Sequence, residues 1–238
     1  MKRNNLLFIL ILLLAGVFSF SNSVHAGEND PFKKNITIKG INKIDITIAC
    51  KMYLQQSQSE SLKIEADEDI LEQLDVVQND STLHIDSDCA HNDFKEWNVK
   101  IYVSLKELKK LDISGAVKLK NKDVLKGEKL SIKISGAADL DLNLDVNKLL
   151  ADFSGAVNAD LEGRADYVVM DMSGASRVDA DDLITQAFYL DFSGFGKAEI
   201  HAEKVLKVDM SGMGVVKYSG NPQKIKTETS GLGRVKSR

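Results

Sequence analysis

Carboxylates recur at a fixed spacing in the second half of this 238-residue sequence. One set lies two residues before a repeated serine, and a second set lies six residues after it. Paired carboxylates can act as acid and nucleophile on a glycosidic bond, and clustered carboxylates can bind calcium. We call the two sets the Asp152 column and the Asp160 column. They are Asp152, Asp171, Asp191 and Asp209, and Asp141, Asp160, Asp179 and Glu199.

Neither column by itself predicts catalysis. Carboxylates stacked on successive repeats lie about 5 Å apart, which is the spacing of a retaining glycosidase pair, but any stacked column produces it. A catalytic acid also needs burial to raise its pKa, and calcium needs several ligands that converge in one loop. We therefore expect solvated faces screened by neighbouring cations such as Arg177 and Lys197. The sequence predicts no catalytic residue, metal or cofactor, and the two columns remain candidate binding residues.

The carboxylates belong to a short sequence motif, here called the Ser-Gly phrase, which recurs seven times from Leu111 to the C-terminus. Its centre is Ser-Gly followed by a small or apolar residue, and the steps between serines are 21, 19, 19, 20, 18 and 19 residues. A fixed period of this length indicates a solenoid, in which each repeat stacks on its neighbours. The serines are Ser114, Ser135, Ser154, Ser173, Ser193, Ser211 and Ser230.

The residues around each Ser-Gly alternate between apolar and polar, as in Leu111-Asp112-Ile113. This period of two predicts strands with one buried face. About nineteen residues fit one coil of three short strands, and stacked coils form parallel sheets with right-handed crossovers. We predict an all-β, right-handed parallel β-helix. The alternative, a β-sandwich, would need Asn-Gly or Asp-Gly hairpins, and these are absent. The glycine either turns the corner with positive φ or lets neighbouring coils pack closely.

The N-terminal part, residues 32–110, is rich in predicted strands but lacks the Ser-Gly phrase. We expect irregular, wider coils or a small antiparallel cap, with a helical turn or a corner near residues 67–74. The C-terminal end is basic, which discourages end-to-end association of exposed strand edges. Its cations are Lys224, Lys226, Arg234, Lys236 and Arg238.

Residues 1–26 have the pattern of a secretory signal peptide. Lys2 and Arg3 precede a short apolar run, and Val24-His25-Ala26 is a suitable cleavage site. No cysteine follows the run, which disfavours a lipid anchor, and no later segment is long and apolar enough to span a membrane. We expect residues 27–238 to form one domain in the periplasm or at the cell surface. Its net charge is 31 − 2 − 35 = −6, which argues against binding to nucleic acid.

Cys50 and Cys89 are the only cysteines. An exported chain could join them in a disulfide worth about 4 kcal/mol, or Cys50 could be a small core residue of an alternating strand. Trp97 and Tyr102 could stack on a sugar, although strand aromatics usually belong to the core. No histidine accompanies the repeated serines, so they are not catalytic nucleophiles.

Several of these features together resemble the head GIN domain family of auto-transporter adhesins. They are Gly40-Ile41-Asn42, the alternating strand over residues 44–48, the repeated Ser-Gly-Ala and the later Tyr218-Ser219-Gly220-Asn221-Pro222. Later repeats depart from the phrase, because Phe195, Met213 and Leu232 replace the alanine. The resemblance implies a β-helical protein of the bacterial envelope and supplies no catalytic residues.

These observations lead us to expect an exported, non-enzymatic binding or adhesion module. It would present a flat face of the solenoid to a polysaccharide or to a protein of the envelope or cell surface. Two alternatives remain open: a carbohydrate-active enzyme, by analogy with other β-helices, and a structural protein of the envelope.

Overall fold

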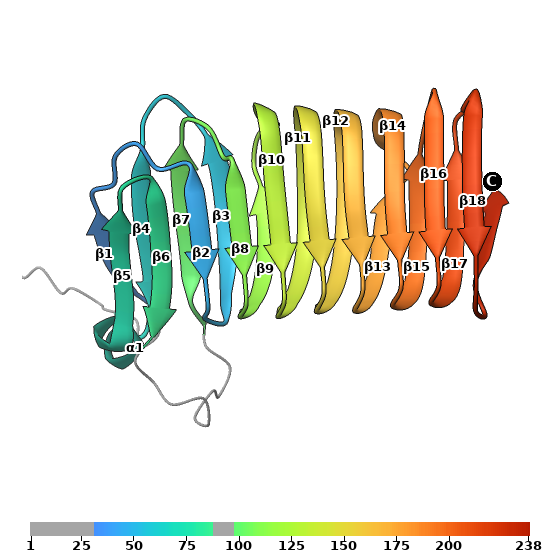
Figure 1. The fold of residues 1–238 in the computed structure, drawn as a ribbon. Helices are drawn as coiled ribbons and strands as arrows, with labels where there is room; N and C mark the ends of the chain where they lie inside the picture. Colours follow the sequence, from blue (N-terminus) through green and yellow to red (C-terminus); the bar gives the residue numbers. More distant parts are fainter. Residues whose placement is uncertain (1–30, 88–97) are drawn as a thin grey trace, which may run out of the picture. The chain divides into compact units, whose positions relative to one another are not determined.

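The computed structural model describes residues 31–87 and 98–238, and residues 31–238 form one compact unit (Figure 1). Parallel strands stack as the coils of a solenoid, so the predicted β-helix is confirmed. The strands of the regular part are β8 (Lys110–Ile113), β9 (Ala116–Asn121), β10 (Leu125–Ile134), β11 (Ala137–Phe153), β12 (Ala156–Met172), β13 (Ala175–Ala180), β14 (Leu183–Phe192), β15 (Phe195–His201), β16 (Val205–Met210), β17 (Met213–Ser219), β18 (Lys224–Thr229) and β19 (Arg234–Ser237).

Each Ser-Gly corner separates two faces of the solenoid. We call the sheet before the corner the pre-serine face and the sheet after it the post-glycine face. Strict register keeps like residues in line: Asp152 pairs with Asp171 on the pre-serine face, and Asp141 pairs with Asp160 on the post-glycine face. The prediction of three separate strands per coil is only partly right. β11 and β12 each run from one corner to the next without a break, and only residues 202–204 lie between β15 and β16.

The interior is one continuous apolar core made by the inward residues of both faces. Phe153, Phe188 and Phe192 are completely buried in it. Burial of apolar surface is the main source of stability in such a stack, at about 25 cal/mol per Å². The last coil departs from the pattern, because Thr227 and Thr229 stand in the core columns and are exposed. The C-terminal coil thus covers the core beneath it with polar side chains, as terminal repeats of solenoids do.

The corner glycines allow close approach of successive coils. A Cβ atom on Gly155 would lie 1.8 Å from the carbonyl oxygen of Gly136, and one on Gly174 would lie 2.0 Å from that of Gly155. Neither of these glycines has positive φ, so close packing is the correct interpretation for them, whereas Gly231 at the last corner has a positive φ of 115°. Backbone hydrogen bonds link the same corners, since the amide of Ala156 donates to the Gly136 oxygen at 3.0 Å.

The N-terminal part contains a further copy of the corner phrase. β2 and β3 pair in parallel with β8 and β9, and this register places Ile44–Ala49 on Leu111–Ala116. Thr47 therefore takes the place of Ser114, and Ile48 takes that of Gly115. The strands and helix of this part are β1 (Phe32–Ile36), β2 (Lys43–Ile46), β3 (Cys50–Gln56), β4 (Ser61–Ala66), α1 (Glu68–Gln73), β5 (Leu74–Asn79), β6 (Thr82–Ser87) and β7 (Lys100–Leu105).

The coils of this part do not stack in sequence order. β6 and β7 pair in parallel with β2 and β3, so the later coil lies outside the earlier one (Figure 1). β1, β4 and β5 then add antiparallel strands, and α1 supplies the expected helical turn. Irregular coils and an antiparallel cap are thus both present.

Cys50 is a buried thiol without a disulfide, and burial raises its pKa to about 12. It occupies a core position, as the second interpretation of the cysteines predicts. Cys89, Trp97 and the expected signal peptide lie outside the described residues.

Candidate functional site

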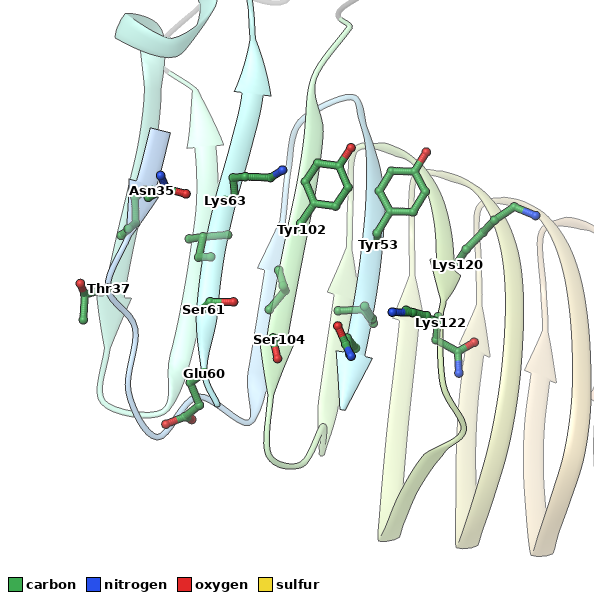
Figure 2. Close-up of a pocket in the computed structure, with 16 residues that line it drawn as sticks. Asn35, Thr37, Tyr53, Glu60, Ser61, Lys63, Tyr102, Ser104, Lys120 and Lys122 are labelled. Atoms are coloured by element: carbon green, nitrogen blue, oxygen red, sulfur yellow. The ribbon is translucent and has the colours of Figure 1, made fainter. Parts of the chain in front are cut away.

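A groove of about 800 Å³ lies on the post-glycine face, where the first coils meet the cap (Figure 2). One row of its side chains crosses four adjacent strands in register: Lys63 of β4, Tyr102 of β7, Tyr53 of β3 and Lys120 of β9. A second row consists of Ser61, Ser104 and Gln55 from the same strands and of Lys122, which directly follows β9. We call this depression the tyrosine groove.

Tyr53 and Tyr102 form a stacked pair, with ring centroids 5.0 Å apart and planes inclined by 15°. The Lys63 Nζ lies 4.3 Å from the centre of the Tyr102 ring, on the side away from Tyr53. Both faces of Tyr102 are therefore covered. Figure 2 shows the two rings next to each other with their hydroxyl groups at the same end.

Glu65 holds the outer end of this row in place. Its carboxylate accepts hydrogen bonds from the Lys63 Nζ at 2.9 Å and from the Tyr102 hydroxyl at 3.2 Å. These bonds lower the pKa of Glu65, because Lys63 stabilises the charged form most strongly. Burial and the adjacent carboxylate raise the pKa of Tyr102, so that hydroxyl stays protonated and remains a donor.

The rest of the groove combines an apolar floor with uncharged polar groups. Leu54, Leu62 and Val103 are buried at its base, and the hydroxyls and amides of the second row stand above them. Among the described residues that line it, Glu60 is the one carboxylate. Its side chain is 8% exposed and accepts a hydrogen bond from the Gly40 amide at 2.8 Å. This lining offers no carboxylate pair for acid–base chemistry.

Sequence reasoning did not identify this groove. It named Tyr102 only as a companion of Trp97, and it did not consider Tyr53 or Lys122. A signal was present, because Tyr53 and Tyr102 both occupy outward positions in strictly alternating strands. The register that places them side by side joins residues 49 positions apart through the pairing of β3 with β7.

The Asp160 column continues the row of the tyrosine groove along the post-glycine face. Lys120, next to Tyr53, contacts Asp141, which opens the column. At the other end, Lys197 and Lys217 each bind Glu199 at 2.8 Å and lower the pKa of that carboxyl to about 2. In the middle, partial burial and the neighbouring Asp179 and Asp141 raise the pKa of Asp160.

The screening expected of Arg177 is not seen as an ion pair. Within residues 31–87 and 98–238, neither Asp160 nor Asp179 has an ion-pair partner, although Lys197 does screen Glu199. Lysines thus neutralise the carboxylates at the two ends of the column, whereas the repulsion between the carboxylates at its centre is not relieved by an ion pair with any described residue.

The Asp152 column lies on the pre-serine face, so the two columns do not form one site. None of its four aspartates has an ion-pair partner in the described part of the chain. Partial burial, Asp191 and Asp152 raise the pKa of Asp171. The described residues also contain no group of three His, Cys, Asp or Glu side chains that could hold a metal ion.

We expect opposite effects on stability from two neutral substitutions in the Asp160 column. Asp160→Asn should leave the free energy of unfolding unchanged or raise it by about 0.5 kcal/mol, because it removes repulsion. Glu199→Gln should lower it by about 2 kcal/mol, since two charge-assisted hydrogen bonds weaken. Urea unfolding at neutral pH measures both.

The dependence on pH and salt follows from the same repulsion. The pKa of Asp160 is higher in the folded than in the unfolded chain, so its stabilising contribution is complete below the unfolded pKa and is lost as pH rises through the folded pKa. Sodium chloride should raise the melting temperature, and millimolar calcium at equal ionic strength should add little. A rise of many degrees with calcium, abolished by Asp160→Asn, would contradict this and reveal a metal site.

A family model described as "Putative auto-transporter adhesin, head GIN domain" matches residues 40–222. The chain belongs to this family. The match includes both tyrosines of the groove and all eight residues of the two acidic columns. No curated protein matches the chain. The adhesin-type family points to an extracellular or cell-envelope location, and the described part of the chain has no helix able to cross a membrane.

Solved structures share the fold over almost their full length. A putative adhesin from Bacteroides fragilis is 24% identical with a TM-score of 0.81, and the match covers 88% of this chain and 97% of that one. A putative adhesin from Parabacteroides merdae is 22% identical with a TM-score of 0.63, covering 89% and 98%. A structure described as a putative lipid binding protein, from Parabacteroides distasonis, is 18% identical with a TM-score of 0.61, covering 89% and 98%. At these identities the likeness shows the fold alone.

Proposed function

We propose that this protein is an exported, non-enzymatic binding module that holds a glycan in the tyrosine groove. Residues 1–26 direct export, and residues 27–238 act as one domain in the periplasm or at the cell surface. The observation that carries the proposal is the groove itself, with its stacked pair of Tyr53 and Tyr102 above a row of hydroxyl and amide groups.

The composition of the groove supports a binding role. Ligand sites combine apolar surface with a few polar groups that orient the ligand, and about 800 Å³ is enough for several sugar units. Tyr53 offers an apolar ring with a polar tip, and it is 38% exposed. Ser61, Ser104 and Gln55 can exchange hydrogen bonds with sugar hydroxyls.

The alternative of a carbohydrate-active enzyme has less support. Glycoside hydrolysis generally needs two carboxyl groups on either side of the scissile bond. Glu60 is the one carboxylate among the described residues of the groove, and the Gly40 amide already binds it. If the protein had a purely structural role in the envelope, the groove would have no ligand. Binding experiments in which no glycan binds would support that role.

A glycan-array screen tests the proposal, with Tyr53→Ala as the groove variant. Tyr189→Ala is a matched control, because Tyr189 also contacts a tyrosine, with its ring centroid 4.9 Å from that of Tyr167. We expect Tyr53→Ala to weaken binding by about tenfold or more, and Tyr189→Ala to leave it within about twofold. Equal losses, or no bound glycan at all, would argue against the groove as the site.

A further inference from the structure

The cations of the tyrosine groove outnumber its carboxylates. Lys63, Lys120 and Lys122 line it, against Glu60 alone. Glu60 is nearly buried, and Lys106, which does not line the groove, lies 4.0 Å from it. A ligand in the groove therefore meets a positive local field.

Two of the three lysines have counter-charges, but these lie outside the groove lining. Lys63 binds Glu65, and Lys120 binds Asp141. Hydrogen bonds to these carboxylates raise the pKa of both lysines, which keeps them protonated. Lys122 has no ion-pair partner among the described residues, so its ammonium group is free to meet a ligand.

The orientation of the tyrosines adds to this field. Tyr102 lies between Tyr53 and the Lys63 ammonium, and the next strand places Lys120 beside Tyr53. Both hydroxyl groups lie at the same end of the stack (Figure 2). The Tyr102 hydroxyl donates to Glu65, whereas the Tyr53 hydroxyl makes no hydrogen bond to any described residue. The Tyr53 hydroxyl is therefore available to donate a hydrogen bond to an anion.

The central strands beneath the groove are paired on both edges. β3 pairs with β7 and β9, β7 pairs with β3 and β4, and β4 pairs with β7 and β1. A peptide could not add itself as a strand between them, although β1, which borders the groove with Asn35 and Ile36, pairs on one edge only among the described strands. The side-chain hydroxyls and amides that remain suit the many hydroxyl groups of a saccharide.

We propose that the groove selects an anionic oligosaccharide, whose carboxylate or sulfate group binds Lys122 and the Tyr53 hydroxyl. This inference rests on the proposed glycan-binding function and specifies its ligand class. Sugar rings lie over Ser61, Ser104 and Gln55, and the acidic substituent points toward the lysines.

The test uses isothermal titration of the protein with three hexasaccharides. They are an oligogalacturonate, a carrageenan fragment, whose anionic groups are all sulfates, and neutral maltohexaose. We expect an acidic probe to bind about tenfold or more tightly than the neutral one, and the two acidic probes distinguish carboxylate from sulfate recognition. Raising sodium chloride from about 50 to about 300 mM should weaken the complex with an acidic probe several-fold, because salt screens the attraction between the ligand's anionic group and the lysine ammonium groups.

Charge reversal locates the site. Lys122→Glu should weaken acidic binding by about tenfold or more, whereas Lys129→Glu, the same change on the pre-serine face, should alter it by less than about twofold. Lys122 and Lys129 are both exposed, so neither change disturbs the core. Thermal unfolding of each variant verifies the fold, and the salt dependence of the unmodified protein provides a measurement that needs no variant.

The outcomes separate this inference from the proposed function. Equal binding of acidic and neutral probes, lost in Tyr53→Ala, would overturn the anionic class and leave glycan binding in place. A polyglutamate peptide, titrated in the same way, is the non-saccharide control, and its tighter binding than that of either acidic sugar would overturn the ligand class as well. Binding of an acidic probe that neither Tyr53→Ala nor Lys122→Glu weakens, or no binding of any probe, would overturn both.

Discussion

Phe153→Asp should abolish the cooperative fold of the solenoid. Phe153 is completely buried between Ile134 and Met172 of the neighbouring coils. Loss of a buried phenylalanine costs about 3–5 kcal/mol, and an unpaired carboxylate in the core adds several more. The sum approaches the whole stability of a typical domain, about 5–15 kcal/mol. Far-UV circular dichroism and urea unfolding measure the effect.

Asp152→Asn is the matched control, one residue earlier on the same strand. Asp152 points to solvent, and its substitution should change the free energy of unfolding by about 0.5 kcal/mol or less. The two results test which residues face inward. Similar effects from both changes would refute the assignment of the columns to opposite sides of the sheet.

Gly155→Ala should destabilise the stack by about 3 kcal/mol or more, although it adds one methyl group. The new Cβ would lie 1.8 Å from the Gly136 oxygen, 2.7 Å from the Ser135 oxygen and 2.8 Å from the Ser135 carbonyl carbon, and these three contacted atoms all belong to the backbone. The corner cannot move away without lengthening the hydrogen bond from the Gly155 amide to Ile134, now 3.1 Å. Overpacking of this kind costs about 1–3 kcal/mol in ordinary cores, where side chains can give way.

Gly127→Ala provides the same chemical change at a permissive position. A Cβ there would meet only the side chain of Glu107, at 3.5 Å, which is ordinary contact. We expect stability to be unchanged or to rise by about 0.5 kcal/mol, because alanine restricts the unfolded chain. Equal melting temperatures for the two variants would show that the coils can separate at the corner, against the close-packing explanation.

Much of the fold was predictable because each regular coil depends mainly on its neighbours. The alternation around Leu111-Asp112-Ile113 marks the inward and outward residues, and the repeated Ser-Gly marks the corner. Stacking then follows from the constant period, without knowledge of distant contacts. Both acidic columns were predictable for the same reason, and so was their place on the outward side of the strands, although the Glu199 side chain is only 12% exposed.

The candidate site was not predictable in this way. The groove needs β7 beside β3, although β4, α1, β5 and β6 separate them in the sequence. The phrase over Ile44–Ala49 was also overlooked, because Ile48 stands where the other copies have glycine. Without that first coil, the sequence offers no register for the strands of the N-terminal part.

The sequence alone therefore determined the solenoid, its inward and outward columns and the positions of its corners. These are local properties, since each strand pairs with the strand one period away. Only the tertiary structure decided that the coil of β6 and β7 lies outside the coil of β2 and β3. That choice rests on long-range strand pairing and on the burial it permits, which no local pattern encodes. The same choice places Lys63, Tyr102, Tyr53 and Lys120 in one row and so creates the tyrosine groove.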